Sequence, residues 1–184
     1  MLPILPICKR CGAGVAVDHT CSGGSIFIIN GTCGSGKSTV ADLLMDKGFL
    51  AIDGDCIIQV VKHKKGVKNV NFADMADETA HAIDILSLLG DRFVLASVIL
   101  PEDLEKYIDI FKSRNMKYKF ILLRPDYQTA VDRCQSRTCH TSITPEYWIR
   151  HFYDLLAFDE RVAVVDNTQV TAEETAGVVL ELMV

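Results

Sequence analysis

Short apolar runs alternate with longer amphipathic stretches along the chain from residue 25 onward. The apolar runs predict five buried strands, at residues 25–30, 49–53, 92–97, 118–123 and 162–166. The stretches between them predict helices at residues 36–48, 55–65, 72–90, 101–115, 126–137 and 145–158, and a capping box opens a last helix after residue 171. Because each apolar strand is followed by helical sequence, the pattern predicts an α/β fold with three αβα layers around a five-stranded parallel sheet.

Residues 1–24 have no long periodic pattern and are punctuated by Pro and Gly. The chain has 184 residues, which is enough for one well-buried domain and short for two. We therefore expect residues 1–24 to form a short cysteine-rich N-terminal appendage and residues 25–184 to form one domain.

Composition narrows the class of protein. Hydrophobic residues make up 49% of the chain and charged residues 23%, as in ordinary soluble proteins. The net charge of −5 makes a general nucleic-acid-coating role a poor fit, although it does not exclude a local basic patch. No apolar run approaches the roughly 20 residues of a membrane helix, and the start "MLPILPICKRCG" lacks the pattern of a secretory signal. We expect a cytoplasmic protein that does not enter a membrane.

One short stretch carries the strongest chemical signal. Between the first predicted strand and helix the chain reads "NGTCGSGKST", in which Gly31, Gly36, Lys37 and Ser38 have the spacing of a P-loop. Glycines let successive backbone N–H groups converge on phosphate oxygens, the lysine reaches the outer phosphates, and the serine hydroxyl ligates Mg²⁺. The predicted nucleotide-binding residues are Gly31, Thr32, Cys33, Gly34, Ser35, Gly36, Lys37, Ser38 and Thr39. A plain turn between strand and helix is the alternative, and the flanking elements favour the phosphate site.

A pair of carboxylates ends the second predicted strand. Asp53 and Asp55 flank Gly54 at the carboxyl end of a strand, which in an open α/β sheet faces the ligand crevice. One carboxylate can organise a metal and its waters, and the other can accept a proton from an acceptor hydroxyl. Alternatively, Asp55 is only the N-cap of the next helix.

The P-loop with the following "FLAIDGDCI" resembles small P-loop kinases of the shikimate kinase, gluconate kinase and adenylylsulfate kinase type, within the AAA-like P-loop NTPase superfamily. The resemblance implies a kinase that uses ATP and Mg²⁺. By position it implies that Asp53 joins Ser38 at the Mg²⁺ site, and that Asp55 binds the acceptor or acts as its base. The chain lacks the acceptor patterns of the shikimate and gluconate enzymes, so the resemblance does not name the acceptor.

Two later segments extend this resemblance. "AVDRCQSRTCHTSITPEYWIRHF" resembles the arginine-bearing lid of those kinases, with Arg133 and Arg137 on one helix face and the next helix opened by Thr144 and Pro145. These arginines would stabilise the transferred phosphoryl group, or they line a solvated, salt-bridged helix face. "VVDNTQVTAEETA" resembles the segment beside adenine, which makes Asp166–Thr168 weak nucleotide candidates; an Asx turn explains them almost as well.

Lysines crowd the segment that should lie beside the acceptor pocket. They are Lys62, Lys64, Lys65 and Lys68. Such a cluster suits an anionic small-molecule acceptor, although a solvated helix end with cations set against the helix dipole is the favoured explanation.

The N-terminal appendage holds four potential metal ligands: Cys8, Cys11, His19 and Cys21. Their spacing could close a tetrahedral structural zinc site. The alternative is a disordered tail with incidental cysteines.

These observations favour an ATP- and Mg²⁺-dependent kinase that phosphorylates a hydroxyl of a small molecule, with Lys37, Asp55, Arg133 and Arg137 as the catalytic candidates. Two other functions stay open: a nucleotide-dependent regulatory or binding NTPase, and a kinase of nucleoside or polynucleotide hydroxyls. An Asn-Lys-x-Asp guanine-binding motif is missing from the sequence, which argues against GTP. The sequence does not indicate an oligomeric state.

Overall fold

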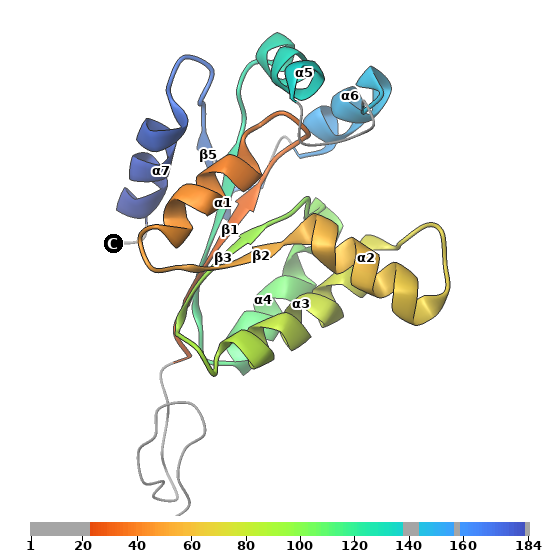
Figure 1. Ribbon diagram of the computed structural model, residues 1–184, viewed down its shortest axis with the longest axis vertical. Helices are drawn as coiled ribbons and strands as arrows, with labels where there is room; N and C mark the ends of the chain where they lie inside the picture. The colour runs from red at the N-terminus through yellow and green to blue at the C-terminus, as the bar shows by residue number, and fades with distance from the viewer. Residues whose placement is uncertain (1–22, 138–143, 157–158, 183–184) are drawn as a thin grey trace, which may run out of the picture.

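A computed structural model describes residues 23–137, 144–156 and 159–182 (Figure 1). The strands are β1 (Ser25–Asn30), β2 (Leu50–Asp53), β3 (Arg92–Ala96), β4 (Lys117–Leu123) and β5 (Val162–Val165). They pair in parallel, in the order β2-β3-β1-β4-β5. The predicted five-stranded parallel sheet of an α/β fold is therefore confirmed.

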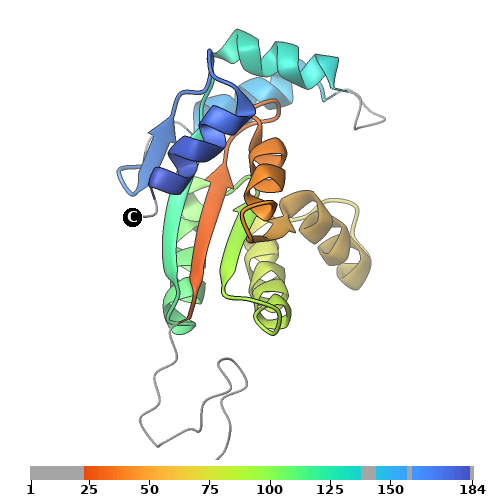
Figure 2. The ribbon, with the colours of Figure 1, turned by 60° about the vertical axis from the view of Figure 1, so that its left-hand side comes forward.

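Helices cover both faces of this sheet. They are α1 (Lys37–Met45), α2 (Gly54–Lys65), α3 (Phe72–Leu86), the 3₁₀ turn η1 (Pro101–Asp103), α4 (Leu104–Ser113), α5 (Tyr127–Ser136), α6 (Glu146–Leu155) and α7 (Ala172–Glu181). Helices α1 and α7 lie on one face, and α2, α3 and α4 on the other (Figure 1). Helices α5 and α6 lie beyond the end of the sheet toward which the β1 arrow points (Figure 2). The P-loop starts at that same end.

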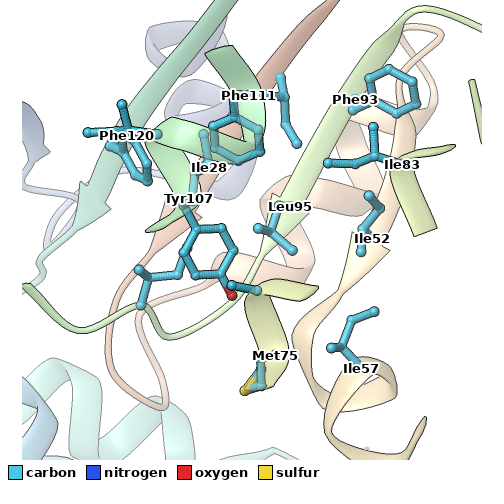
Figure 3. Close-up of a cluster of buried hydrophobic side chains, with 14 of the residues drawn as sticks. Ile28, Ile52, Ile57, Met75, Ile83, Phe93, Leu95, Tyr107, Phe111 and Phe120 are labelled. Carbon is cyan, nitrogen blue, oxygen red and sulfur yellow. The ribbon is translucent and has the colours of Figure 1, made fainter. Parts of the chain in front are cut away.

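The central strand β1 is apolar between Ser25 and Asn30 because both of its faces are buried. Along β1, Ile26 and Ile28 enter the core beneath α3 and α4, whereas Phe27 and Ile29 enter the core beneath α1 and α7. Successive side chains of a strand point to opposite faces, so a continuous apolar run supplies both cores. Figure 3 shows the first core, in which Tyr107 packs among the strand side chains.

Several helices end earlier or begin later than the periodicity predicts. Helix α1 ends at Met45 and α3 at Leu86, and a short turn follows each before the next strand. After α1, Gly48 takes a φ of 84° and donates its N–H to the carbonyl of Met45. In sequence, these turns continue the spacing of the preceding helices. The backbone hydrogen bonds of the turns nevertheless end each helix and direct the chain back to the sheet.

The predicted zinc ligands Cys8, Cys11, His19 and Cys21 lie outside the described residues, so the zinc site stays a prediction. Within the described ranges, we find no group of three or more His, Cys, Asp or Glu side chains that could hold a metal ion. The same part of the chain has no helix of the length and apolar character that crossing a bilayer requires.

Candidate active site

The P-loop connects β1 to the first turn of α1. Gly36 precedes this helix with a left-handed φ of 94°, and Lys37 is the first helical residue. The Lys37 ammonium folds back over the loop and donates hydrogen bonds to the carbonyls of Gly31 (2.7 Å) and Thr32 (2.9 Å). Burial lowers the pKa of Lys37 below its usual value, an effect that Cys33 and Asp55 partly oppose. Lys37, at the end of the loop, is therefore hydrogen-bonded back to the first residues of the loop.

Asn30, the last residue of β1, anchors the start of this loop. Its side-chain oxygen accepts hydrogen bonds from the N–H of Gly31 (2.8 Å) and of Ile99 (3.1 Å), and its amide nitrogen donates to the carbonyl of Ile99 (2.7 Å). Thr32 donates its hydroxyl hydrogen to the carbonyl of Ile149 in α6, at 3.0 Å. The loop is thus bonded both to the segment after β3 and to α6.

The middle of the loop packs against α5 and the segment after β5. Gly34 has a φ of 81°, and a Cβ at this position would lie 1.9 Å from the carbonyl oxygen of Ala130. Only glycine fits so close to the α5 backbone. From the other side, the side-chain amide of Asn167 donates to the carbonyl of Ser35 at 3.0 Å.

Three connected hollows surround the loop. The first, the loop hollow, has about 270 Å³ and is lined by Gly34, Gly36, Lys37, Ser38, Thr39, Arg133 and Arg137. The second, the α7 hollow, has about 290 Å³ and lies between the loop, Asn167 and the start of α7. The third, the carboxylate hollow, has about 270 Å³ and contains Asp53 and Asp55. Lys37, Ser38 and Arg137 line both the loop hollow and the carboxylate hollow, so the two are adjacent.

Asp53 and Asp55 are both exposed and both line the carboxylate hollow. The N-cap of α2 is Asp53, whose Oδ1 accepts the N–H of Asp55 at 2.7 Å. The alternative in which Asp55 is only a helix cap is therefore wrong. Gly54 between them packs closely against β3 and the residue after it, because a Cβ at this position would lie 2.5 Å from the Oγ of Ser97 and 3.0 Å from the carbonyl oxygen of Ala96.

The two arginines predicted for the lid, Arg133 and Arg137, line the same hollow, but one lies inside a helix and the other in extended chain after it. Arg133 lies in α5 and donates to the carbonyls of Asn167 (3.0 Å) and Thr168 (3.2 Å). Arg137 follows the helix in an extended conformation and donates to the hydroxyl of Thr144 at 3.0 Å. The prediction that both share one helix face is therefore wrong, yet both line the loop hollow. Thr144 makes this contact instead of capping α6, for which Pro145 is the N-cap.

Of the residues predicted after β5 as nucleotide contacts or an Asx turn, Asp166 and Thr168 form the turn and Asn167 lies beside a hollow. The Oδ1 of Asp166 accepts hydrogen bonds from the N–H and the hydroxyl of Thr168, and these bonds lower the pKa of Asp166. This is the Asx turn that the sequence left open. Of the three residues, Asn167 lines the α7 hollow.

The lysine cluster of α2 makes contacts elsewhere. Lys64 pairs with Glu78 at 2.7 Å and Lys65 with Asp74 at 2.6 Å, which ties the end of α2 to α3. Neither these two nor Lys62 or Lys68 is among the described residues that line the carboxylate hollow.

Sequence reasoning missed several residues of the carboxylate hollow. They are Ile58, Phe72, Met75, Ser97, Val98, Thr144 and Phe152. The apolar ones have the helical or strand spacing of core residues, so nothing in the sequence separates them from the core. Asn30 did give a signal, because it is a polar residue that ends an apolar strand directly before a glycine.

Comparison with known proteins agrees with this geometry. The AAA domain family matches residues 27–148, which include the P-loop, both carboxylates and both arginines. A comparison with curated proteins finds no match. One similar solved structure is the tunicamycin resistance protein of Deinococcus radiodurans, with 15% identity over 86% of this chain and 95% of that one, and a TM-score of 0.62.

Two further solved structures are kinases. A gluconokinase from Sinorhizobium meliloti 1021 has 19% identity over 88% of this chain and 94% of that one, with a TM-score of 0.61. The APS kinase of Mycobacterium tuberculosis, solved in complex with AMPPNP and APS, has 19% identity over 86% and 96%, with a TM-score of 0.56. These likenesses show a shared fold. Because the family match spans more than half of the sequence and contains the P-loop, the chain belongs to the AAA domain family.

Proposed function

We propose that this protein is a Mg²⁺-dependent phosphotransferase that moves the γ-phosphoryl group of ATP to a hydroxyl of a small molecule. One observation carries the proposal: Lys37, Ser38 and Arg137 line both the loop hollow and the carboxylate hollow. A phosphoryl group held by these side chains has a carboxylate on its far side, which is the arrangement that in-line transfer requires. The kinases among the similar structures support the same class of reaction.

The nucleotide would occupy two of the hollows. Its phosphates would lie in the loop hollow at the N-terminus of α1, where unpaired backbone N–H groups and the helix dipole favour anions. The adenine ring of ATP would enter the α7 hollow beside Asn167. Ser38, exposed in the first turn of α1, and Asp53, exposed at the end of β2, supply oxygen donors to the same hollow and suit Mg²⁺. When bound, Mg²⁺ neutralises charge on the phosphate oxygens.

The chain's own groups then divide the work of transfer. Asp55 orients the acceptor hydroxyl and takes its proton as the oxygen bonds to phosphorus. Lys37 and Arg137 stabilise the negative charge of the transferred group, and a charge fixed in place before the reaction needs little reorganisation. Arg133 donates hydrogen bonds to the carbonyls of Asn167 and Thr168, and so positions the segment that lines the proposed adenine site.

A transfer assay tests the proposal. Purified protein is incubated with γ-labelled ATP, Mg²⁺ and a panel of small hydroxyl compounds, and labelled product is separated from labelled phosphate. We expect product above the hydrolysis background with at least one acceptor, and none with the Lys37→Met variant. Slow hydrolysis without transfer to any acceptor would contradict the proposal and favour a nucleotide-dependent regulatory protein.

A further inference from the structure

The carboxylate hollow has apolar lining residues that phosphoryl transfer does not explain. Its polar lining includes Asp53, Asp55, Lys37 and Ser38. Its apolar wall, as we call these residues together, consists of Ile58, Phe72, Met75, Val98 and Phe152, which come from α2, α3, the segment after β3, and α6. Met75 is also part of the core beneath α3 and α4, so this wall is continuous with the hydrophobic interior (Figure 3).

Two of the five residues of this wall, Phe72 and Phe152, are aromatic. Phe72 and Phe152 meet edge to face, with their centroids 5.8 Å apart and their planes at 72°. Trp148 also contacts Phe152 in a stacked arrangement, with the ring centroids 5.8 Å apart and an interplanar angle of 18°. Trp148 keeps 43% of its surface exposed. The rings therefore run from the wall of the hollow to the protein surface, and Phe72 and Phe152 are only half-buried along the way.

Charge in the hollow argues against an anionic acceptor. Among the described lining residues the cations are Lys37 and Arg137, and both also line the loop hollow, where they would face the phosphates of ATP. The carboxylates of Asp53 and Asp55 would repel a second anion. Lys64 and Lys65, which suggested an anionic acceptor in the sequence, pair with Glu78 and Asp74.

We propose that the acceptor is an uncharged molecule with a flat aromatic ring and a hydroxyl group, such as a nucleoside or an aryl alcohol. The inference rests on the phosphotransferase proposed above and names its substrate class. The ring lies against Phe72 and Phe152, where aromatic contacts add to the burial of apolar surface. The hydroxyl lies toward Asp55. Its oxygen bonds to the γ-phosphorus, the bond to the bridging oxygen of ADP breaks, and the hydroxyl proton passes to the Asp55 carboxylate.

The size of the hollow agrees with a single small ring compound. Its volume of about 270 Å³ lies just below the range of typical small-molecule pockets, which begins at roughly 300 Å³. Apolar walls with a few polar groups at one end are typical of such pockets. A strongly hydrated polyol would leave the rings without a partner and lose its own water contacts.

The test uses matched pairs of acceptors that share a hydroxyl but differ in the ring. Uridine is compared with ribose, and benzyl alcohol with cyclohexylmethanol, and gluconate serves as an anionic reference. Binding is followed in the presence of AMPPNP by the emission of Trp148, the only tryptophan in the chain, which stacks directly on Phe152. Phosphoryl transfer is measured separately with labelled ATP.

We expect the aromatic member of at least one pair to bind and react better than its partner. A preference for uridine indicates a nucleoside acceptor, and a preference for benzyl alcohol indicates an aryl alcohol. Phe152→Leu, which keeps apolar volume but removes the ring, should raise the KM of that acceptor about 2- to 12-fold, with kcat and the KM of ATP little changed. Phe72→Leu should do the same and serves as a second variant. Leu155→Ala, an exposed position on the same helix, is the matched control.

The outcomes separate the two proposals. If gluconate or ribose is phosphorylated and the aromatic compounds are no better than their saturated partners, the phosphotransferase proposal stands and the aromatic acceptor is wrong. If an aromatic compound binds, and Phe152→Leu weakens its binding, but no product forms, the ligand class stands and phosphoryl transfer fails.

Discussion

The side chain of Asn167 donates a hydrogen bond to the main-chain carbonyl of Ser35 at 3.0 Å, although 132 positions separate the two residues in the sequence. In a trans peptide the carbonyl and the following N–H point in opposite directions. This bond therefore holds the N–H of Gly36 away from the donor nitrogen of Asn167. A residue after the last strand thus helps to set the direction of an N–H group in the P-loop.

Replacing Asn167 by Ala should weaken both the fold and nucleotide binding. The change leaves the carbonyl of Ser35 without its buried donor, at a cost of about 1–3 kcal/mol. We expect the melting temperature to fall by about 2–10 °C and the affinity for ATP to fall as well. Calorimetry with and without AMPPNP measures both. Gln169→Ala, at an exposed position of the same segment, is the control and should change neither.

Replacing Lys37 by Met should abolish tight ATP binding without unfolding the protein. The ammonium contacts two loop carbonyls and would contact phosphate, and a hydrogen bond to a charged group contributes about 1.5–3 kcal/mol. We expect about 10- to 150-fold weaker binding by titration calorimetry. Unchanged affinity would mean that the P-loop does not bind phosphate.

The same variant gives a pH dependence. Burial lowers the pKa of Lys37 in the folded protein, whereas the unfolded chain keeps a value near 10.5. In the window below 10.5 the unfolded state therefore binds more protons, so this group makes the free energy of unfolding rise as the pH rises. Denaturant titrations at several pH values should show wild type gaining stability relative to Lys37→Met toward pH 10.5. A difference that stays constant with pH would show that the folded pKa is not lowered.

Replacing the two carboxylates should change different properties of the enzyme, the transfer rate for Asp55 and the Mg²⁺ requirement for Asp53. Asp55→Asn should lower the rate of phosphoryl transfer about 10²- to 10⁴-fold while ATP binding persists, because an amide cannot accept the hydroxyl proton. Asp53→Asn should instead raise the Mg²⁺ concentration needed for half-maximal rate, since it removes an anionic oxygen donor. Rates measured over a Mg²⁺ series, with ATP affinity measured in parallel, separate the two effects. Transfer near the wild-type rate in Asp55→Asn would remove Asp55 from the mechanism.

Replacing the two arginines should also affect different kinetic constants. Arg137 lines both the loop hollow and the carboxylate hollow, so Arg137→Met should lower kcat, by about 10²- to 10³-fold if it acts as a preorganised donor. Arg133 bonds the carbonyls of Asn167 and Thr168, so Arg133→Met should mainly raise the KM of ATP. Steady-state kinetics in both substrates distinguishes these patterns, and equal effects on kcat and KM in both variants would contradict the division.

The N-terminal cysteines predict a metal content. If Cys8, Cys11, His19 and Cys21 bind zinc, protein prepared without chelator should contain about one zinc per chain. Cys8→Ser should lose it, because a structural site needs all four ligands. Elemental analysis measures the content, and Cys56→Ser, at an exposed cysteine of α2, is the control. Protein free of zinc would retire the site.

Local sequence was enough for the fold class and the phosphate-binding loop. The strands of the sheet were predicted from their short apolar runs, which are most complete in β1, where both faces are buried. The P-loop was predicted because its glycines and lysine lie close together in the chain. Asp53 and Asp55 were predicted because strand ends in a parallel sheet share one edge. In each case the signal lies within a few residues and follows from local geometry.

Tertiary packing decided the rest. Asn167 reaches Ser35, and Thr32 reaches Ile149, because α6 and the segment after β5 fold over the loop from distant parts of the chain. Phe72 and Phe152 look like core residues in sequence, and only the folded chain shows that their rings meet and line a hollow. Burial and contact across such distances depend on how whole elements pack together, and the local periodicity of a sequence does not encode that packing.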